Sequence, residues 1–252
     1  MEAKQVIKAT NIKKYFGSVR ALEGANIEVY PGEVVGLLGD NGAGKSTLVN
    51  ILSGVYRPDG GELYLDGQKV EFDNPLEARK RGIETVYQEL ALAPHLDIVT
   101  NIFLGREEIR PDLWGRLGFL DRKSMREKAL QDLDKLRITI KSVEQRINQL
   151  SGGQRQAVAV ARAVSWGTKL IIMDEPTAAL GVEESLKVLE LIKEIKNHRI
   201  PIILITHTIP YAFKVCDRLV IMRLGRTIAN LKISETTIDD VIAWITGSKI
   251  SA

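Results

Sequence analysis

Nine consecutive residues carry the groups best suited to binding a phosphate: Gly39-Asp40-Asn41-Gly42-Ala43-Gly44-Lys45-Ser46-Thr47. Gly39 and Gly44 allow backbone angles that are closed to other residues, so the loop can turn its N–H groups around an anion. Lys45 adds a mobile positive charge, and the Ser46 hydroxyl can bind magnesium. The alternative is a glycine-rich turn that binds nothing. A strand and a helix are predicted on either side, which is the context a nucleoside triphosphate site requires, although kinases and GTPases share it.

Two adjacent carboxylates follow an apolar run further along the chain. Leu170–Met173 has no polar residue, as expected for a central parallel strand buried on both faces, and Asp174-Glu175 comes directly after it. Catalytic acids of α/β sheets lie at the carboxyl ends of strands. We expect Asp174 to hold magnesium, directly or through water, and Glu175 to polarise the attacking water. A solvated turn with no function is the alternative for this pair.

A second possible anion site lies at Leu150-Ser151-Gly152-Gly153-Gln154. Ser151 is a good N-cap, and the two glycines leave the first N–H groups of the following helix unobstructed. The loop of Lys45 already surrounds much of one triphosphate, so a second phosphate site invites the nucleotide of another molecule. The sequence therefore predicts two chains arranged head to tail with two ATP molecules between them, related by two-fold symmetry.

The elements that position these groups follow from periodicity and turn signals. Residues 6–29 are rich in β-signals, with turn signals at 16–18 and 23–24. The remaining predicted strands are 33–38, 62–65, 169–173, 202–206, 218–222 and 227–231, with hairpin turns at 66–67 and 224–225. The predicted helices are 46–52, one that begins at Asp121, 151–164, 182–197, and a last one capped by Thr236 or Thr237 that stops at Gly247.

The middle of the chain differs from its two ends. β-type alternation disappears from about Leu90 to Ala163, and helical periodicity replaces it. In the helix after Asp121 the apolar face is predicted to hold Met125, Ala129, Leu130, Leu133 and Leu136; in helix 182–197 it is Leu186, Leu189, Ile192 and Ile195. We expect an α/β core from residues 1–89 and 164–252, with an antiparallel β subdomain near its N-terminus, and an inserted helical subdomain from 90–163.

Composition narrows the functional classes. The 252 residues carry a net charge of +3, with 44% hydrophobic and 27% charged residues, as in ordinary globular proteins. So small a charge does not argue for binding nucleic acid. The one cysteine, Cys216, excludes an internal disulfide and is expected in the core. No signal segment or apolar run of about 20 residues is evident, so we expect a cytoplasmic chain that reaches a membrane only through partners.

The motifs and their order resemble those of ABC-transporter nucleotide-binding subunits over nearly the whole chain. The resemblance implies a P-loop NTPase core that binds ATP and Mg²⁺. It implies that Phe16, with Tyr15 as competitor, stacks on adenine, although Phe16 could instead be a core aromatic. Gln88 would touch magnesium or the attacking water and sense a membrane partner, and His207 would contact the γ-phosphate. His95 and His198 have no such context and are expected at the surface.

One position departs from the family pattern. Where the family usually has Ser-Ala-Leu-Asp after the two carboxylates, this chain has Ala178-Ala179-Leu180-Gly181. The absent aspartate normally communicates across the dimer. We therefore expect weakened or rerouted cross-talk between the two ATP sites, and the rate of hydrolysis is in question.

The cargo is suggested by resemblance alone. The segments 87–90, 101–107 and 175–180 resemble the ATPases of ribose-, xylose- and fructose-type sugar importers. This implies a homodimer, or a pair with a sister ATPase, at the cytoplasmic face of the cell membrane. It also implies separate transmembrane permease subunits, which residues 88–105 would contact, and a periplasmic or extracellular sugar-binding protein. An exporter ATPase and a non-transport ABC ATPase remain alternatives. A P-loop kinase or GTPase would not carry the Leu-Ser-Gly-Gly-Gln motif that this chain has at residues 150–154.

Overall fold

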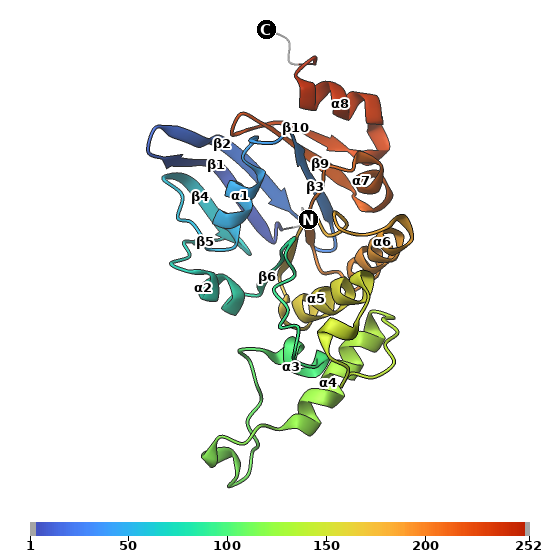
Figure 1. Cartoon of the computed structure of the whole chain (residues 1–252). Helices are drawn as coiled ribbons and strands as arrows, with labels where there is room; N and C mark the ends of the chain where they lie inside the picture. The colour runs from blue at the N-terminus through green and yellow to red at the C-terminus, as the bar shows by residue number, and fades with distance from the viewer. Residues whose placement is uncertain (1–3, 250–252) are drawn as a thin grey trace.

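Two β-sheets organise the chain, which a computed structural model describes for residues 4–249 (Figure 1). The first is antiparallel, in the order β2-β1-β4-β5. Its strands are β1 Ile7–Phe16, β2 Val19–Val29, β4 Gly60–Leu65 and β5 Gln68–Val70. The second has the order β10-β9-β3-β8-β7-β6 and is parallel except for β10. Its strands are β3 Val34–Gly39, β6 Ile83–Val86, β7 Leu170–Asp174, β8 Ile202–Ile205, β9 Arg218–Arg223 and β10 Arg226–Lys232.

The parallel sheet is buried on both faces, which explains its apolar runs. Because successive side chains of a strand point to opposite faces, β7 sends Ile171 and Met173 into one core and Leu170 and Ile172 into the other. Strand β8 divides its residues in the same way. One core lies on the face of the parallel sheet that is covered by the antiparallel sheet and by α1 Lys45–Leu52. The other core lies on the opposite face, which the remaining large helices cover (Figure 1). The predicted α/β class is confirmed.

The antiparallel sheet corrects one turn prediction. The signal at Gly17 marks a turn between β1 and β2, but Glu23-Gly24 lies inside β2. The pairing register shifts there, from Ile12 opposite Ala25 to Lys13 opposite Glu23. Gly24 has a φ of 127°, so a glycine suits this extra residue of a β-bulge. A bulge and a turn use the same residue type, and the strand pairing decides between them.

The capping residues predicted from the sequence lie at the ends of three helices in the structure. The remaining α-helices are α2 Pro75–Lys80, α3 Ile98–Phe103, α4 Arg122–Lys135, α5 Gly152–Trp166, α6 Val182–Asn197, α7 Ile209–Val215 and α8 Ile238–Thr246. Asp121 caps α4, Ser151 caps α5, Thr237 caps α8 and Gly247 ends it, as predicted. The predicted apolar faces of α4 and α6 each include one residue too many. Leu130 of α4 is 44% exposed and Leu186 of α6 is 39% exposed, because each lies at the edge of the buried face of its helix.

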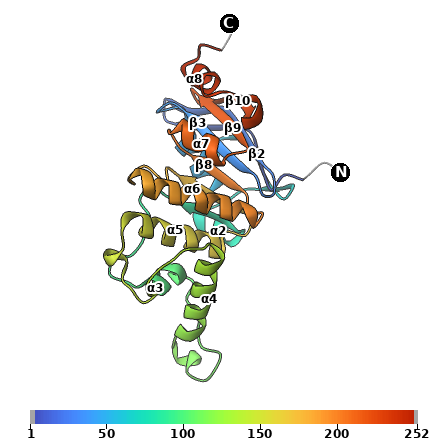
Figure 2. The same cartoon turned by 90° about the vertical axis from the view of Figure 1, so that its right-hand side faces the viewer.

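The helices α3, α4 and α5 pack together below the sheets, and the chain between α3 and α4 projects beyond them (Figure 2). Helix α5 also packs against α6 and β6, and so joins this helical region to the parallel sheet. It continues to Trp166, three residues past the predicted subdomain boundary, and the division into core and insert stays a prediction. Within residues 4–249, every helix is too short or too polar to cross a bilayer.

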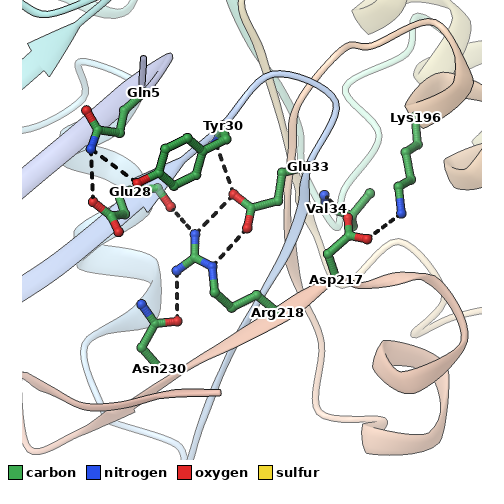
Figure 3. A network of polar contacts seen from close by, with 9 residues as sticks. All are labelled: Gln5, Glu28, Tyr30, Glu33, Val34, Lys196, Asp217, Arg218 and Asn230. Carbon is green, nitrogen blue, oxygen red and sulfur yellow. Dashed lines mark hydrogen bonds and ion pairs between the residues drawn. The ribbon is translucent and has the colours of Figure 1, made fainter. Parts of the chain in front are cut away.

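A buried arginine joins the two sheets (Figure 3). Arg218 of β9 is 9% exposed and donates twice to Glu33, at 2.8 and 3.1 Å. It also donates to the carbonyl of Glu28 in β2 at 2.6 Å and to the side chain of Asn230 in β10 at 2.8 Å. One guanidinium therefore binds three segments, and its charge is matched by a carboxylate in the same site.

Candidate functional site

Four of the segments that carry predicted site residues follow neighbouring strands of the parallel sheet. In the strand register Leu37 of β3 and Asp174 of β7 both lie beside Ile205 of β8, and Val86 of β6 lies beside Met173. The carboxyl ends of these four strands therefore share an edge. The phosphate loop follows β3, Gln88 comes two residues after β6, Asp174-Glu175 ends β7, and His207 comes two residues after β8. Strand order brings these segments together, since they are far apart in the sequence.

Close packing makes glycine necessary in the phosphate loop. Gly39 has a φ of 152°, and a Cβ atom there would lie 2.3 Å from the carbonyl oxygen of Met222. Gly44 has a φ of 97°, and its Cβ would lie 2.7 Å from the side chain of Leu22. Gly44 is the N-cap of α1, which has no side-chain cap and no acidic residue in its first turn. The start of α1 therefore offers backbone N–H groups to an anion with no carboxylate of its own in that turn.

Lys45 lies folded back on this loop. Its Nζ donates to the carbonyl oxygens of Gly39 and Asp40 at 2.8 and 2.9 Å. Burial lowers the pKa of Lys45, while the charges of Glu175, Asp40 and Asp174 oppose that shift. The ammonium is therefore held among negative charge and carbonyl oxygens, in position for a triphosphate laid on the loop.

Asp174 and Glu175 are partly buried beside each other. Burial and the Glu175 charge raise the pKa of Asp174, and Lys45 opposes the shift. This carboxylate lacks enough positive charge around it, and a divalent cation would supply that charge. Ser46 provides a hydroxyl, Asp174 a carboxylate and Gln88 an amide, which are oxygen ligands of the kind magnesium prefers. The donor set therefore fits Mg²⁺.

Glu175 has an unusual backbone and an unusual side-chain environment. Its φ is 49°, in the left-handed region that few non-glycine residues adopt. Its Oε2 lies 2.9 Å from Nδ1 of His207, although the angles are not those of a hydrogen bond, so this buried oxygen accepts none. The His207 side chain is 71% exposed. A strained residue with a buried oxygen free to accept is a reasonable position for a general base.

The second predicted anion site opens α5. Ser151 Oγ accepts from the N–H of Gln154 at 3.2 Å, and Gln154 Oε1 accepts from the N–H of Ser151 at 3.0 Å. These reciprocal bonds form a capping box. The N–H of Gly153 donates to Glu184 of α6 at 3.3 Å, and a Cβ at Gly153 would press against the same side chain. Glu184 carries no local signal for this position in the sequence, because only the packing of α6 on α5 brings it there.

The aromatic candidates for the adenine lie at the end of β1. Phe16 and Tyr15 are 42% and 41% exposed, so the alternative of a core aromatic at Phe16 is wrong. Phe16 makes an edge-to-face contact with Tyr56 at 5.2 Å, and Lys14 Nζ lies 5.7 Å from its ring. Tyr56 was not anticipated, and its sequence neighbourhood carries no signal for it. His95 and His198 are exposed and Cys216 is buried, as predicted.

Gly181 caps α6 without a side chain. Its φ of −66° is open to every residue, and a Cβ atom there would meet nothing within 4 Å. An aspartate would fit at this position and would supply the missing side-chain cap. Packing within one chain therefore does not explain why glycine replaces the usual aspartate.

Comparisons with known proteins agree with this geometry. The family described as ABC transporter matches residues 22–178. The fructose import ATP-binding protein of Rhizobium meliloti is 47% identical over 251 residues, which cover 99% of this chain and 96% of that protein. The xylose/arabinose import ATP-binding protein of Sulfolobus acidocaldarius is 46% identical over 241 residues, covering 96% of this chain and 94% of that protein.

A solved structure extends the likeness to three dimensions. The dimeric structure of a post-hydrolysis state of an ATP-binding cassette bound to ADP and phosphate superposes with a TM-score of 0.73 at 29% identity. The match covers 90% of this chain and 98% of that one. The likeness therefore extends over almost all of the elements that carry the site.

Proposed function

This chain belongs to the ABC transporter family of ATPases, and on that premise we propose that it energises the import of a monosaccharide through separate transmembrane permease subunits. The observation that carries the ATPase part is the meeting of the phosphate loop, Asp174-Glu175 and His207 at one sheet edge. The cargo class rests on the relatives, whose names specify fructose and xylose or arabinose import.

The site residues have separate roles in ATP hydrolysis. The backbone N–H groups at the start of α1 and the ammonium of Lys45 hold the phosphates, and Phe16 stacks on the adenine. Glu175 Oε2 accepts a proton from the attacking water, and His207, at 2.9 Å from that oxygen, reaches the γ-phosphate. Ser46, Gln88 and Asp174 would hold Mg²⁺, which neutralises charge on the phosphate oxygens when bound.

A second copy, or a sister ATPase, completes each site. Ser151 and the N–H groups of Gly152 and Gly153 contact the γ-phosphate bound to the partner chain. The dimer in the related cassette bound to ADP and phosphate supports this arrangement. The capping box supports it too, because it holds the Ser151 hydroxyl and the helix start in one orientation.

The membrane partner is reached through the region that follows Gln88. The chain works at the cytoplasmic face of the membrane, where the permease contacts the segment from Gln88 to Gly105. A sugar-binding protein on the other side of the membrane delivers the cargo to that permease.

Reconstitution with the neighbouring gene products tests the cargo. The chain, the permease and the binding protein encoded beside it would be placed in proteoliposomes, and ATP hydrolysis measured with fructose, xylose, arabinose and ribose in turn. We expect one monosaccharide to stimulate hydrolysis in the complete system, and no stimulation without the binding protein. Stimulation by a cargo of another class, or outward transport, would replace the sugar-import assignment and leave the ATPase assignment in place.

A further inference from the structure

A cavity of about 240 Å³ lies between α2, β6 and the helices α3 and α5. Three arginines line it, Arg79, Arg106 and Arg162, and only one carboxylate, Glu84. Tyr87 and Ala91, which flank Gln88 in the sequence, also line it. The cavity is therefore electropositive and touches the segment that carries a proposed site residue.

The one carboxylate that lines the cavity, that of Glu84, already forms an ion pair. Glu84 is 8% exposed and forms an ion pair with Arg106, whose guanidinium also stacks on Trp166 at 4.9 Å. Arg79 reaches the other oxygen of Glu84 only at 3.9 Å. Glu84 balances about one positive charge, and two guanidinium charges remain at the cavity wall.

Arg162 is bound to the backbone and not to a carboxylate within residues 4–249. Its guanidinium donates to the carbonyl oxygens of Leu90 and Ala91 at 3.0 and 2.8 Å. Burial, Arg79 and Arg106 lower the pKa of Arg162, and Glu84 opposes the shift, as expected in an electropositive environment. The two carbonyl oxygens are neutral, so they accept hydrogen bonds from Arg162 without compensating its charge.

The backbone that Arg162 holds is strained. Ala91 has a φ of 49°, a left-handed conformation that costs a non-glycine residue free energy. The hydrogen bonds from Arg162 to residues 90 and 91 help to hold this conformation three residues after Gln88. Any group that draws the Arg162 guanidinium away would weaken that hold.

We infer that this cavity receives an acidic side chain from a cytoplasmic segment of the permease, and that Arg162 transmits its arrival to the segment that carries Gln88. The inference rests on the proposed function and adds the chemistry by which the partner is recognised. Charge complementarity favours this occupant, since one carboxylate would pair with Arg79 and Arg162 while Glu84 keeps Arg106. Arg162 would then exchange its carbonyl partners for a charged one, which relaxes residues 90–91. In this way Arg162 is a positioning residue for Gln88.

Binding to the permease encoded beside this chain tests the inference. With that permease in nanodiscs, we expect Arg79→Ala and Arg162→Ala each to weaken binding about tenfold or more, because each leaves the partner's carboxylate without a bidentate or charged donor. Arg162→Lys keeps the charge but not the paired N–H groups that hold two carbonyls. It should bind within about threefold of the wild type, a much smaller loss than that of Arg162→Ala, and should lose stimulation of ATP hydrolysis by the permease.

Matched controls separate this role from folding. Arg126→Ala removes an exposed arginine on α4 outside the cavity and should leave binding and stimulation unchanged. Arg79→Ala should keep the melting temperature and the unstimulated ATPase rate, and replacing the matching permease acid by arginine should restore the binding of Arg79→Glu. Wild-type binding and stimulation in folded Arg79→Ala and Arg162→Ala would overturn the inference and leave the proposed function standing. Failure of the unmodified chain to bind the permease would overturn both.

Discussion

At the scale of single residues, the charged side chains of the site are held in surroundings that do not balance their charges. Asp174 and Glu175 adjoin one another at the end of β7, and Lys45 is bound to carbonyl oxygens. Burial raises the pKa of Asp174 and lowers that of Lys45, so both groups are held in less favourable surroundings than water provides. A bound nucleotide with its metal would relieve both, which gives an electrostatic reason for tight binding at this edge.

Glu175→Gln removes the oxygen charge proposed to accept the proton of the attacking water. We expect the rate of ATP hydrolysis to fall by about 10²- to 10⁴-fold, which is the usual contribution of a general base, while ATP binding is retained. The slowed chain should accumulate as an ATP-bound dimer visible by size-exclusion chromatography. Turnover at the wild-type rate would sink the assignment of this residue.

Asp174→Asn should stabilise the chain in the absence of nucleotide, and it removes a proposed ligand of Mg²⁺. Because the folded-state pKa of Asp174 is raised, its contribution to stability is favourable below the unfolded pKa of about 3.9 and is lost as the pH rises through the folded value. At neutral pH the variant should therefore melt at a higher temperature in EDTA, and this gain should shrink as the pH falls towards 4. Melting curves across pH, with and without Mg²⁺-ATP, check this. An equal gain at every pH would contradict the electrostatic explanation.

At the scale of elements, the start of α5 combines two requirements. The Ser151–Gln154 capping box holds the helix end, and the glycines let α6 approach closely enough for Glu184 to accept from Gly153. A phosphate of a partner chain would compete with Glu184 for that N–H. Because residue 181 is glycine, it has no side chain that could reach across a dimer, although a side chain would have open space there.

Ser151→Arg should block dimer closure without affecting ATP binding by one chain. The bulky side chain would occupy the space for the partner's γ-phosphate, whereas Ser151→Ala loses only the cap, at about 1 kcal/mol of stability. Both variants would be made in the Glu175→Gln background and their ATP-dependent dimerisation compared. If Ser151→Arg dimerises as readily as its parent, the shared-site hypothesis is wrong.

At the scale of the whole molecule, Arg218 holds the two sheets in one arrangement (Figure 3). Its partners come from β2, from the turn before β3 and from β10, so the antiparallel sheet cannot shift relative to the parallel one without breaking the hydrogen bond from Arg218 to the carbonyl oxygen of Glu28. This geometry matters for function, because Phe16 lies on the antiparallel sheet and the phosphate loop follows the parallel one. The arginine therefore stabilises the relative position of Phe16 and the phosphate loop, the two ends of the proposed nucleotide site.

Arg218→Met should cost about 3–5 kcal/mol of unfolding free energy, because it leaves the mostly covered carboxylate of Glu33 without its cation. Arg226, at the other end of the β9–β10 hairpin, forms a more exposed pair with Glu23, and Arg226→Met should cost only about 0–1 kcal/mol. Urea unfolding of both variants provides the comparison. The prediction fails if the two losses are equal. A cycle with Glu33→Gln would show how much of the loss at Arg218 belongs to the ion pair.

The phosphate loop, the class of fold and most helix ends could be predicted from the sequence, because their causes are local. A glycine that must adopt a left-handed angle, or an Asp121, Ser151 or Thr237 that caps the next turn, acts within a few residues of itself. The apolar runs of β7 and β8 likewise report burial on both faces directly.

Tertiary structure alone decided which distant residues meet. The order of the strands places His207 beside Glu175. Pairing between strands made Gly24 a bulge and not a turn, and helix packing brought Glu184 to α5. The cavity of Arg162 arose in the same way, from α5 lying against the chain after β6. Contacts between segments so far apart depend on the whole set of packing energies, which no local pattern of residues records.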